Sequence, residues 1–404
     1  MTKFLKAFLS LILTFSLFCV SVSAATVSSE CDLSDINVPI DTTVNNAAIG
    51  QTLDIKAKSV ILMEPHTLTV LYESNCDEKL SPASITKIMS LLLVMEALDR
   101  GDITLETVVT ASEHACSMGG SQIWLEPNET MTVHELLKAT VIASANDACV
   151  ALGELISGSE EGFVALMNAR AKELGCNNTN FINCTGLDAE GHLTSAYDVA
   201  IMSSELIKHP LIKDYSTVWM DSLRNGESEL VNTNKLVRFY KGATGLKTGT
   251  TSTAGYCLSA TARRDGMELV AVVMSGDTSN DRFNGAKKLL DYGFANYSFF
   301  EIEADLGDVN KVSVKKGVSR DVKIKADGKL SLLLPKSEAK QITQKLNLKS
   351  NVTAPVKKGQ VVGNVDIYVG DKSVGSIKVV SNAQVKRLNL WITFKHIASG
   401  LLIL

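Results

Sequence analysis

Ser84 and Lys87 stand three residues apart in the stretch SPASITKIM, which runs from residue 81 to residue 89. Side chains at this spacing share one helix face with Cβ atoms about 5–6 Å apart, so the lysine amine can reach the serine hydroxyl. The apolar run that follows predicts a buried lysine, and burial lowers the pKa of a lysine until its free amine can act as a base. A serine can be activated in this way without histidine. The same spacing also occurs by chance at ordinary helix starts, so it needs support from other motifs.

Two polar motifs further along the chain supply that support. Residues 144–146 (Ser-Ala-Asn) interrupt an apolar helical run, where polar groups are costly to bury unless they have partners. Residues 247–249 (Lys-Thr-Gly) open a β-rich segment, in which the glycine lets a ligand approach the backbone closely. The order SxxK, SxN, KTG is that of class A β-lactamases and penicillin-binding proteins. The joint pattern is much more specific than SxxK alone.

The chain resembles the serine D-alanyl-D-alanine carboxypeptidase family, the low-molecular-mass penicillin-binding proteins. The resemblance runs from about residue 55 to the C-terminus, and Ala145 replaces the glycine that usually stands in the second motif. It implies an α+β fold with a DD-peptidase/β-lactamase-like catalytic domain, in which helices flank an antiparallel sheet. A small all-β domain and a C-terminal amphipathic helix would follow. The resemblance rests on the segments AKSVILMEP, PASITKIM, MGGSQIWLEP, IASANDACVALGE, FINCTGLDAEGHLTSAYDVA, GLKTGTTSTAGYCLSATA and KKLLDYGF.

The resemblance implies catalytic roles for the first two motifs. Ser84 would be the nucleophile that attacks the carbonyl of the penultimate D-alanine in a peptidoglycan stem peptide, and Lys87 would take its proton. Ser144 would relay a proton toward the leaving D-alanine. Asn146 would hold both the substrate amide and the Lys87 ammonium. β-Lactams would acylate Ser84 because they mimic the D-alanyl-D-alanine end.

The third motif would bind the substrate. Lys247 and Thr248 would face the terminal carboxylate as charge and hydroxyl, and Gly249 would leave room for the ligand. The backbone N–H groups of Ser84 and Thr250 would form the oxyanion hole. No cofactor or metal is expected, because an HExxH motif is absent and the six histidines have no ligand-like spacing.

Other functions share parts of this pattern. A β-lactamase needs rapid deacylation, commonly through a water held by a glutamate, and no ExxLN-like segment lies between Asn146 and Lys247. β-Lactamases also lack a C-terminal β-domain with an anchor. A non-catalytic peptidoglycan-binding protein is less favoured, because all the catalytic residue types are present. Endopeptidase or transpeptidase action on peptidoglycan cross-links is an alternative that the motifs do not separate from the carboxypeptidase.

The N-terminus predicts export from the cytoplasm. A basic start is followed by an apolar stretch over 8–20 and by small residues at 22–24, which is typical of a secretory signal peptide. A lipoprotein signal centred on Cys19 is less favoured, because Ser16 stands where a leucine is expected. Residues 25–50 are polar and predict a flexible leader. The predicted location is therefore extracytoplasmic, at the outer face of a bacterial plasma membrane.

The 404 residues, 45 % of them hydrophobic, are enough for two domains, and the net charge of −4 gives no sign of a nucleic-acid partner. Patterning predicts a β-hairpin at 57–74, helices at 131–157 and 161–174, two strands about a turn at 264–266, and a helix at 283–297. Short alternating strands follow, with one helix at 337–346. The predicted divisions are a signal peptide (1–24), a leader (25–50), a catalytic domain (51–300), a β-rich domain (301–383) and an anchor helix (384–404).

The last segment predicts an amphipathic helix that lies in the membrane surface. A membrane span would place Lys395 near the bilayer centre at a cost of roughly 2.5–3.5 kcal/mol. An in-plane helix avoids this cost and lets Lys386 and Arg387 meet anionic head groups. A span or a helix packed on a domain are the alternatives.

Several other side chains are given structural roles. Ser81 and Pro82 would begin the helix that carries Ser84. Cys149 and Cys257 are expected to be buried free thiols, and His192 to be structural. Two arginines, Arg264 and Arg282, are expected to be solvated at the surface. Residues 119–121 are interpreted either as part of the cleft or as a simple turn.

Overall fold

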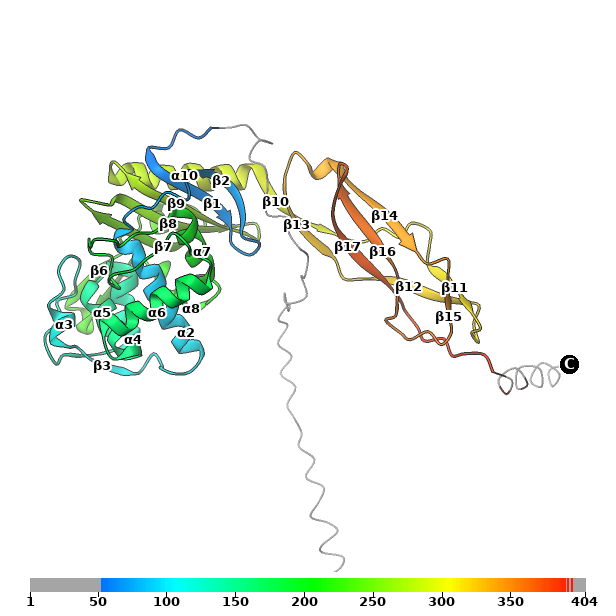
Figure 1. Cartoon of the computed structure of the whole chain (residues 1–404), viewed down its shortest axis with the longest axis horizontal. Coiled ribbons are helices and arrows are strands. Elements are labelled where there is room, and N and C mark those ends of the chain that lie inside the picture. The colour runs from blue at the N-terminus through cyan, green and yellow to red at the C-terminus, as the bar shows by residue number, and fades with distance from the viewer. Residues whose placement is uncertain (1–51, 390, 392–393, 395–404) are drawn as a thin grey trace, which may run out of the picture. The chain divides into compact units, whose positions relative to one another are not determined.

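The computed structural model describes residues 52–389, 391 and 394 (Figure 1). The expected signal peptide (1–24) and leader (25–50) lie outside these residues, and so does most of the expected anchor helix. Within the described part, an α+β domain is followed along the chain by a β-rich domain. No helix of this described part is long and apolar enough to cross a bilayer.

The α+β domain is built on a five-stranded antiparallel sheet in the order β2-β1-β9-β8-β7. The β1–β2 hairpin and the β8–β9 turn confirm two predictions from the sequence. Strand β9 is buried along its whole length, because helices cover both faces of the sheet. The strands are β1 (Ala57–Glu64), β2 (Thr69–Ser74), β7 (Ala243–Thr251), β8 (Gly255–Arg264) and β9 (Met267–Gly276).

Side chains alternate between two cores on either side of this sheet, as the two-residue period of a strand requires. Ile61 and Met63 of β1 belong to a large core with the helices on one face, whereas Val60 and Leu62 belong to the core beneath α10 (Ser279–Asn296). Figure 1 shows α10 across the sheet from the other helices. Those helices are α2 (Lys87–Asp99), α3 (Glu113–Cys116), α4 (Val133–Lys138), α5 (Asn146–Ser157), α6 (Glu160–Glu173), α7 (Ala196–Leu206), α8 (Leu211–Ser216) and α9 (Leu236–Phe239).

The segment that carries Ser84 differs from its expected form. Residues Ala83–Thr86 form a 3-10 turn, η3, and the α-helix begins only at Lys87. Pro82, rather than Ser81, occupies the cap position, and no side chain caps the turn. Ala83 has a φ of 49°, so the backbone bends sharply just before Ser84.

The helix expected over 131–157 is interrupted. After α4 the chain continues through a π turn, η4 (Ala139–Ala143), and Ser144 adopts the left-handed conformation with a φ of 65°. Helix α5 then begins at Asn146. The prediction of a single helix is therefore wrong at the SxN motif, because that motif forms the break. The helix predicted at 161–174 is confirmed as α6.

The remaining short strands of this domain form two antiparallel pairs outside the main sheet. One pairs β3 with β4, and the other pairs β5 with β6 around the short turn η5. Their bounds are β3 (Val108–Thr110), β4 (Thr130–Thr132), β5 (Met220–Leu223), η5 (Arg224–Gly226) and β6 (Ser228–Val231).

The β-rich domain contains a six-stranded sheet in the order β14-β16-β17-β12-β11-β15 and a β10–β13 pair. The helix predicted at 337–346 is wrong, because only Ala339–Gln341 forms a 3-10 turn, η6, and Ile342–Leu348 forms strand β14. Its lysines and glutamines suit a helix, but β14 pairs along its whole length with β16. The strands are β10 (Tyr297–Ile302), β11 (Lys311–Lys315), β12 (Asp321–Asp327), β13 (Leu330–Pro335), β14, β15 (Asn351–Thr353), β16 (Val361–Val369) and β17 (Lys372–Ser381).

Candidate active site

The first two sequence motifs meet at the amine of Lys87. Its Nζ donates hydrogen bonds to the Ser84 Oγ at 3.2 Å, to the Asn146 Oδ1 at 2.6 Å and to the Thr185 carbonyl oxygen at 2.7 Å. The lysine has no exposed surface. Three segments that are far apart in the chain thus converge on one amine, which lies within hydrogen-bond distance of the serine hydroxyl.

Burial lowers the pKa of Lys87, because the charged ammonium loses its hydration. Three acidic groups, Cys149, Cys184 and Asp147, act in the opposite direction but do not outweigh burial. The neutral amine is therefore favoured more than in an exposed lysine. A neutral amine has two N–H groups, which can serve the Asn146 and Thr185 oxygens, and one lone pair, which can accept the proton of the Ser84 hydroxyl.

Asn146 is oriented by the loop that precedes it in the sequence. Its Nδ2 donates to the Gly119 carbonyl oxygen at 2.6 Å, and its backbone N–H donates to the Ser121 carbonyl oxygen at 2.7 Å. Because the amide nitrogen is held by Gly119, the Oδ1 faces Lys87. Gly120 has a φ of 79°, and a Cβ there would lie 2.9 Å from the Asn146 Nδ2. The loop at 119–121 therefore does more than turn the chain, since it sets the direction of this amide.

Ser144 is buried in the break between η4 and α5, with 4 % of its surface exposed. Its Oγ has no hydrogen-bond partner among the described residues. An unpartnered buried hydroxyl is costly, and a native protein that retains one usually uses it for function. The strained left-handed backbone at the same residue leads to the same interpretation.

The third motif lies on the edge strand β7 of the main sheet. Lys247 is 1 % exposed, and its Nζ donates to the Thr248 carbonyl oxygen at 3.1 Å. The Thr248 Oγ1 donates to the Thr233 Oγ1 at 2.7 Å. Burial holds the pKa of Lys247 well below its usual range, and repulsion from Lys87 and Arg282 adds to this effect.

Gly249 brings β7 against the turn that carries the serine. A Cβ at this position would lie 2.8 Å from the Pro82 carbonyl oxygen and 2.9 Å from the Ser84 backbone nitrogen. Any larger residue would push the strand away from the turn. Gly186 plays a similar part on another side, because a Cβ there would lie 1.9 Å from the Ala83 carbonyl oxygen.

The expectation that Arg282 lies at the surface is wrong. The residue is 8 % exposed, and its guanidinium donates to the Gly249 carbonyl oxygen at 2.9 Å and to the Thr250 Oγ1 at 2.8 Å. Helix α10 thereby binds the C-terminal part of β7 through Arg282. The other arginine, Arg264, is half-buried and its guanidinium lies 4.4 Å from the centroid of the Tyr240 ring.

The expectations for His192 and the cysteines agree with the structure. His192 is buried between the Thr86 Oγ1, at 2.8 Å from its Nε2, and the Ile182 N–H, at 3.0 Å from its Nδ1. Burial lowers its pKa to about 4, so the ring is neutral at physiological pH and acts as a structural link. Cys149 and Cys257 are both buried free thiols.

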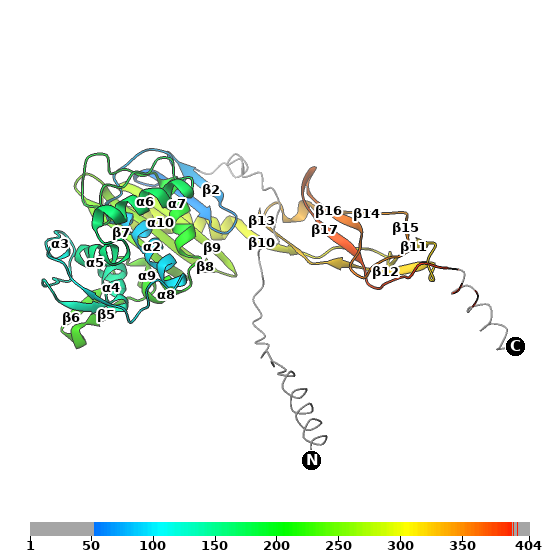
Figure 2. The same ribbon diagram turned by 60° about the horizontal axis from the view of Figure 1, so that its bottom comes forward.

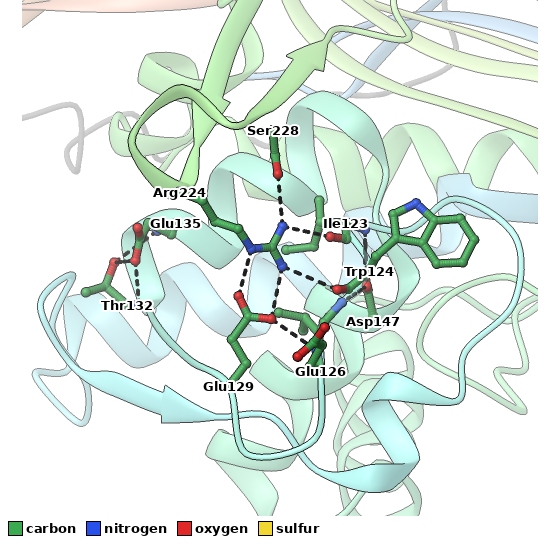
Figure 3. Close-up of polar contacts among 10 residues, drawn as sticks. Ile123, Trp124, Glu126, Glu129, Thr132, Glu135, Asp147, Arg224 and Ser228 are labelled. Carbon is green, nitrogen blue, oxygen red and sulfur yellow. Dashed lines mark hydrogen bonds and ion pairs between the residues drawn. The ribbon is translucent and has the colours of Figure 1, made fainter.

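A buried carboxylate that the sequence analysis missed supports the SxN motif. Asp147 follows Asn146, and its Oδ2 accepts the backbone N–H groups of Ile123 and Leu125, each at 3.1 Å (Figure 3). Trp124, between them, has a φ of 60° and a side chain that is 74 % exposed. The carboxylate thus ties the 119–125 loop to the start of α5.

Arg224, in the turn of the β5–β6 hairpin, fixes the same loop through a second set of hydrogen bonds. The Arg224 guanidinium donates to both Glu129 oxygens, at 2.8 and 3.0 Å, and to the Ile123 carbonyl oxygen at 2.9 Å (Figure 3). The hydrogen bonds from Arg224 hold the pKa of the Glu129 carboxyl below its usual range. Local sequence patterns could not reveal this pair, because its members are 95 residues apart.

We expect Asp147→Asn to lower the rate of Ser84 acylation at least ten-fold. The amide has the volume of the carboxylate but turns an NH₂ toward a backbone N–H, which leaves a buried donor unsatisfied at a cost of about 1–3 kcal/mol. Removing the negative charge also lowers the pKa of Lys87 further, because Asp147 is one of the groups that raise it. The acid limb of the acylation rate should therefore move to lower pH.

The measurement is the second-order rate constant for acylation by a fluorescent penicillin between pH 5 and 9. Glu129→Gln is the matched control, because it weakens the interaction between Arg224 and Glu129 without changing the charge beside Lys87. An unchanged rate in Asp147→Asn, or an equal shift of the acid limb in both variants, would contradict the assigned role.

The convergence of a serine hydroxyl, a buried lysine amine and a second buried lysine defines a class of protein. These groups can form an acyl-enzyme on serine with lysine in place of histidine as the base. The β7 lysine, Lys247, adds a hydrogen-bond donor for an anionic substrate group, whose negative charge would favour the protonated lysine. The site is that of a serine acyl-transfer hydrolase with the SxxK arrangement.

Comparisons with known proteins identify the family within this class. Residues 43–278 match the family model for D-alanyl-D-alanine carboxypeptidase, and residues 305–387 match that for the C-terminal domain of penicillin-binding protein 5. The D-alanyl-D-alanine carboxypeptidase DacF of Bacillus subtilis (strain 168) is 45 % identical over 343 residues, which cover 84 % of this chain and 88 % of that protein. The chain belongs to the serine D-alanyl-D-alanine carboxypeptidase family of penicillin-binding proteins.

Solved structures agree with this assignment. Penicillin-binding protein 5 from Haemophilus influenzae superimposes with a TM-score of 0.68 at 31 % identity, covering 83 % of this chain and 99 % of that one. Penicillin-binding protein D2 from Listeria monocytogenes, in its ampicillin-bound form, gives a TM-score of 0.55 at 30 % identity and covers 60 % of this chain and 99 % of that one. The two family matches confirm the predicted combination of an α+β peptidase domain and a β-rich domain.

Proposed function

We propose that this carboxypeptidase removes the terminal D-alanine from peptidoglycan pentapeptide stems through an acyl-enzyme on Ser84. The observation that carries the proposal is the buried Lys87 amine, whose pKa is lowered and whose Nζ lies 3.2 Å from the Ser84 Oγ. In the first step the Ser84 oxygen bonds to the carbonyl carbon of the penultimate D-alanine, and its proton passes to Lys87. The bond to the last D-alanine then breaks, and water hydrolyses the ester that remains.

Ser144 relays a proton to the nitrogen of the leaving D-alanine in this proposal. Its unpartnered buried hydroxyl is available for that step. Asn146 holds Lys87 through its Oδ1 and contacts the substrate amide. The backbone N–H groups of Ser84 and Thr250 form the oxyanion hole, in which one donor is typically worth roughly 2.7–4 kcal/mol of the barrier. The close approach of Gly249 to the Ser84 nitrogen supports this arrangement.

Lys247 and Thr248 bind the terminal carboxylate in the same proposal. Lys247 is buried and forms no ion pair with a described carboxylate, so a substrate carboxylate would stabilise its protonated form. This pairing explains a requirement for a free C-terminus. β-Lactams carry a carboxylate beside their reactive carbonyl and would occupy the same positions. The ampicillin-bound relative supports β-lactam binding by this fold.

The function is tested with a soluble peptide that ends in D-alanyl-D-alanine. We expect release of one D-alanine for each peptide, little release from the same peptide with an amidated C-terminus, and slow stoichiometric acylation by penicillin. Rapid catalytic hydrolysis of penicillin would instead favour a β-lactamase. A transpeptidase would be favoured if two peptides became joined and no hydrolysed, shortened peptide were released.

Replacing Lys247 with methionine should weaken substrate recognition without weakening the fold. We expect kcat/KM for the free-acid peptide to fall at least 100-fold, because a buried carboxylate would lose its cationic partner. The amidated peptide should be much less affected. We also expect the free energy of unfolding near pH 7 to stay equal or rise by about 1–3 kcal/mol, because methionine needs no hydration.

The pH dependence of stability gives this prediction a second readout. The pKa of Lys247 is lower in the folded chain than in the unfolded chain, so the folded state binds fewer protons between that lowered value and about 10.5. Stability of the wild-type protein therefore contains a component that increases as pH rises through this window. The component should be reduced in Lys247→Met, as measured by thermal unfolding at several pH values. A large loss of stability in the variant would assign Lys247 a structural role instead.

We also propose that the mature chain works at the outer face of the plasma membrane, held by its C-terminal segment. The support from the sequence is the secretory pattern at 1–24 and the amphipathic pattern at 384–404. Two described aromatic side chains of the latter segment, Trp391 and Phe394, are 65 % and 63 % exposed, and their rings stack with centroids 6.1 Å apart. Exposed aromatic rings of this kind favour the interfacial region of a bilayer.

A further inference from the structure

Three segments of the β-rich domain meet where the chain leaves it toward Trp391. They are the β11–β12 turn (315–320), the loop before β16 (354–360) and the end of the domain (385–388). Backbone hydrogen bonds join the turn to the chain end, from the Val318 N–H to the Lys386 carbonyl oxygen at 3.0 Å and from the Leu388 N–H to the Lys316 carbonyl oxygen at 2.8 Å. A bridge between Val356 and Val385 joins the loop to the same chain end.

These three segments carry a concentration of positive charge. They contain no aspartate or glutamate, and their basic side chains are all exposed and form no ion pair with any described residue. We call this group the basic collar. Its members are Lys315, Lys316, Arg320, Lys357, Lys358, Lys386 and Arg387.

The basic collar occupies one end of the domain rather than its whole surface. Strand β12 runs from Asp321, beside the collar, to Asp327. Asp327 lies opposite Lys378 of β17 in the strand register. At the far end of the domain, Lys329 is neutralised by Glu301 and Glu303, with nitrogen–oxygen distances of 3.5 and 2.9 Å. Both views place β11 and β15 beside the last coloured residues of the chain (Figures 1 and 2).

Apolar side chains continue from the collar along the chain. Leu388 is 43 % exposed, and the stacked rings of Trp391 and Phe394 follow it. A combination of basic and exposed aromatic side chains fits a bilayer surface, where anionic head groups border the acyl region. A soluble polyanion would satisfy the charges but would leave the apolar side chains in water. The composition of the collar and of the segment that follows it therefore favours a lipid surface.

We propose that the basic collar docks the β-rich domain directly onto anionic phospholipid head groups. This inference rests on the membrane location in the proposed function, and it adds five basic residues of the folded domain to the two that the C-terminal segment supplies. The domain then binds the membrane as a rigid body through three hydrogen-bonded segments. It does not merely link the peptidase domain to an anchor.

The experiment uses the full mature chain and vesicles of phosphatidylglycerol and phosphatidylcholine, with pure phosphatidylcholine as the neutral reference. The collar variant carries Lys315→Gln, Lys316→Gln, Lys357→Gln and Lys358→Gln. Each basic residue near an anionic surface strengthens binding about five-fold, so two contacting lysines already predict a loss of about 30-fold in partition to the anionic vesicles. Binding to the neutral vesicles should not change.

The matched control removes four exposed lysines that lie outside the collar, and so changes the net charge equally. It carries Lys325→Gln, Lys340→Gln, Lys345→Gln and Lys378→Gln, and its partition should fall less than three-fold. Equal losses in the two variants, or no loss in the collar variant, would overturn the proposal. Loss of binding to soluble polyphosphate with unchanged vesicle binding would also overturn it.

The catalytic proposal is tested separately in the same samples. D-Alanine release from a soluble peptide should be equal in the wild type and in both variants, because no collar residue lies in the peptidase domain. Failure of vesicle binding with normal D-alanine release would count against the collar alone. Failure of D-alanine release in the wild type would count against the catalytic proposal alone.

Discussion

Ser84→Ala should abolish both D-alanine release and covalent labelling by penicillin. The substitution removes the oxygen that forms the acyl-enzyme, and no other described hydroxyl is a hydrogen-bond partner of the Lys87 amine. We expect labelling to fall below detection, a loss of more than about 10⁵-fold in acylation, comparable to removing the nucleophile of other serine hydrolases. Intact-mass spectrometry after mixing with a β-lactam measures the adduct directly.

The fold should survive this change. Ser84 lies in a short 3-10 turn, and losing one hydroxyl from a half-buried position changes the free energy of unfolding by about 1 kcal/mol or less. Thermal unfolding of the variant is the control for loss of structure. Labelling that persists in a folded Ser84→Ala protein would rule out Ser84 as the nucleophile.

Lys87→Arg should reduce the rate of Ser84 acylation by about as much as the complete loss of a general base. Arginine keeps the positive charge and the hydrogen-bond donors, but it cannot give up its proton in a protein. General base catalysis typically contributes 10²–10⁴-fold, so we expect the acylation rate to fall by at least about 10³-fold. The longer side chain also has to fit between Asn146 and the Thr185 carbonyl oxygen.

Lys87→Met separates the two possible functions of this side chain. If Lys87 acts only as a fixed cation, arginine should retain much of the activity and methionine should lose it. If Lys87 acts as a base, both variants should be inactive, and the wild-type acylation rate should rise with pH through the lowered pKa of Lys87. Substantial activity in Lys87→Arg would contradict the role of Lys87 as the base that activates Ser84.

The sequence indicated which side chains meet in the candidate site better than it indicated the secondary structure that holds them. The spacing of Ser84 and Lys87 is local, so their contact follows from helical geometry, although the serine lies in a 3-10 turn just before the helix. The convergence of Asn146 and Lys247 on that contact could be expected only from the order of the three motifs. Spacing alone says nothing about which distant segments fold together.

The supporting residues were missed because their partners are remote in the chain. The Thr185 carbonyl oxygen binds an amine 98 residues away, and Arg282 binds the Gly249 carbonyl oxygen 33 residues away. A backbone carbonyl has no sequence signature. An arginine is usually solvated, so its burial becomes visible only when the neighbouring elements are in place.

The β-rich domain shows a different limit of predicting secondary structure from sequence patterns. Its short alternating strands were predicted correctly, but the segment that contains β14 was predicted to be a helix. Residues such as Lys345 and Gln344 favour helices on their own, whereas pairing with β16 across seven positions decides the outcome. Pairing between segments is a tertiary effect, which outweighs the modest propensity of single residues.

The most direct measurement for the central claim is peptide mapping of the wild-type protein after acylation by a β-lactam. Trypsin cuts after Lys79 and Lys87, so the predicted site lies in the octapeptide Leu80–Lys87. If Ser84 is the nucleophile, this peptide carries the whole adduct mass, and fragmentation places the adduct on Ser84. An adduct on any other residue, or rapid β-lactam turnover with no adduct, would contradict the assignment of Ser84.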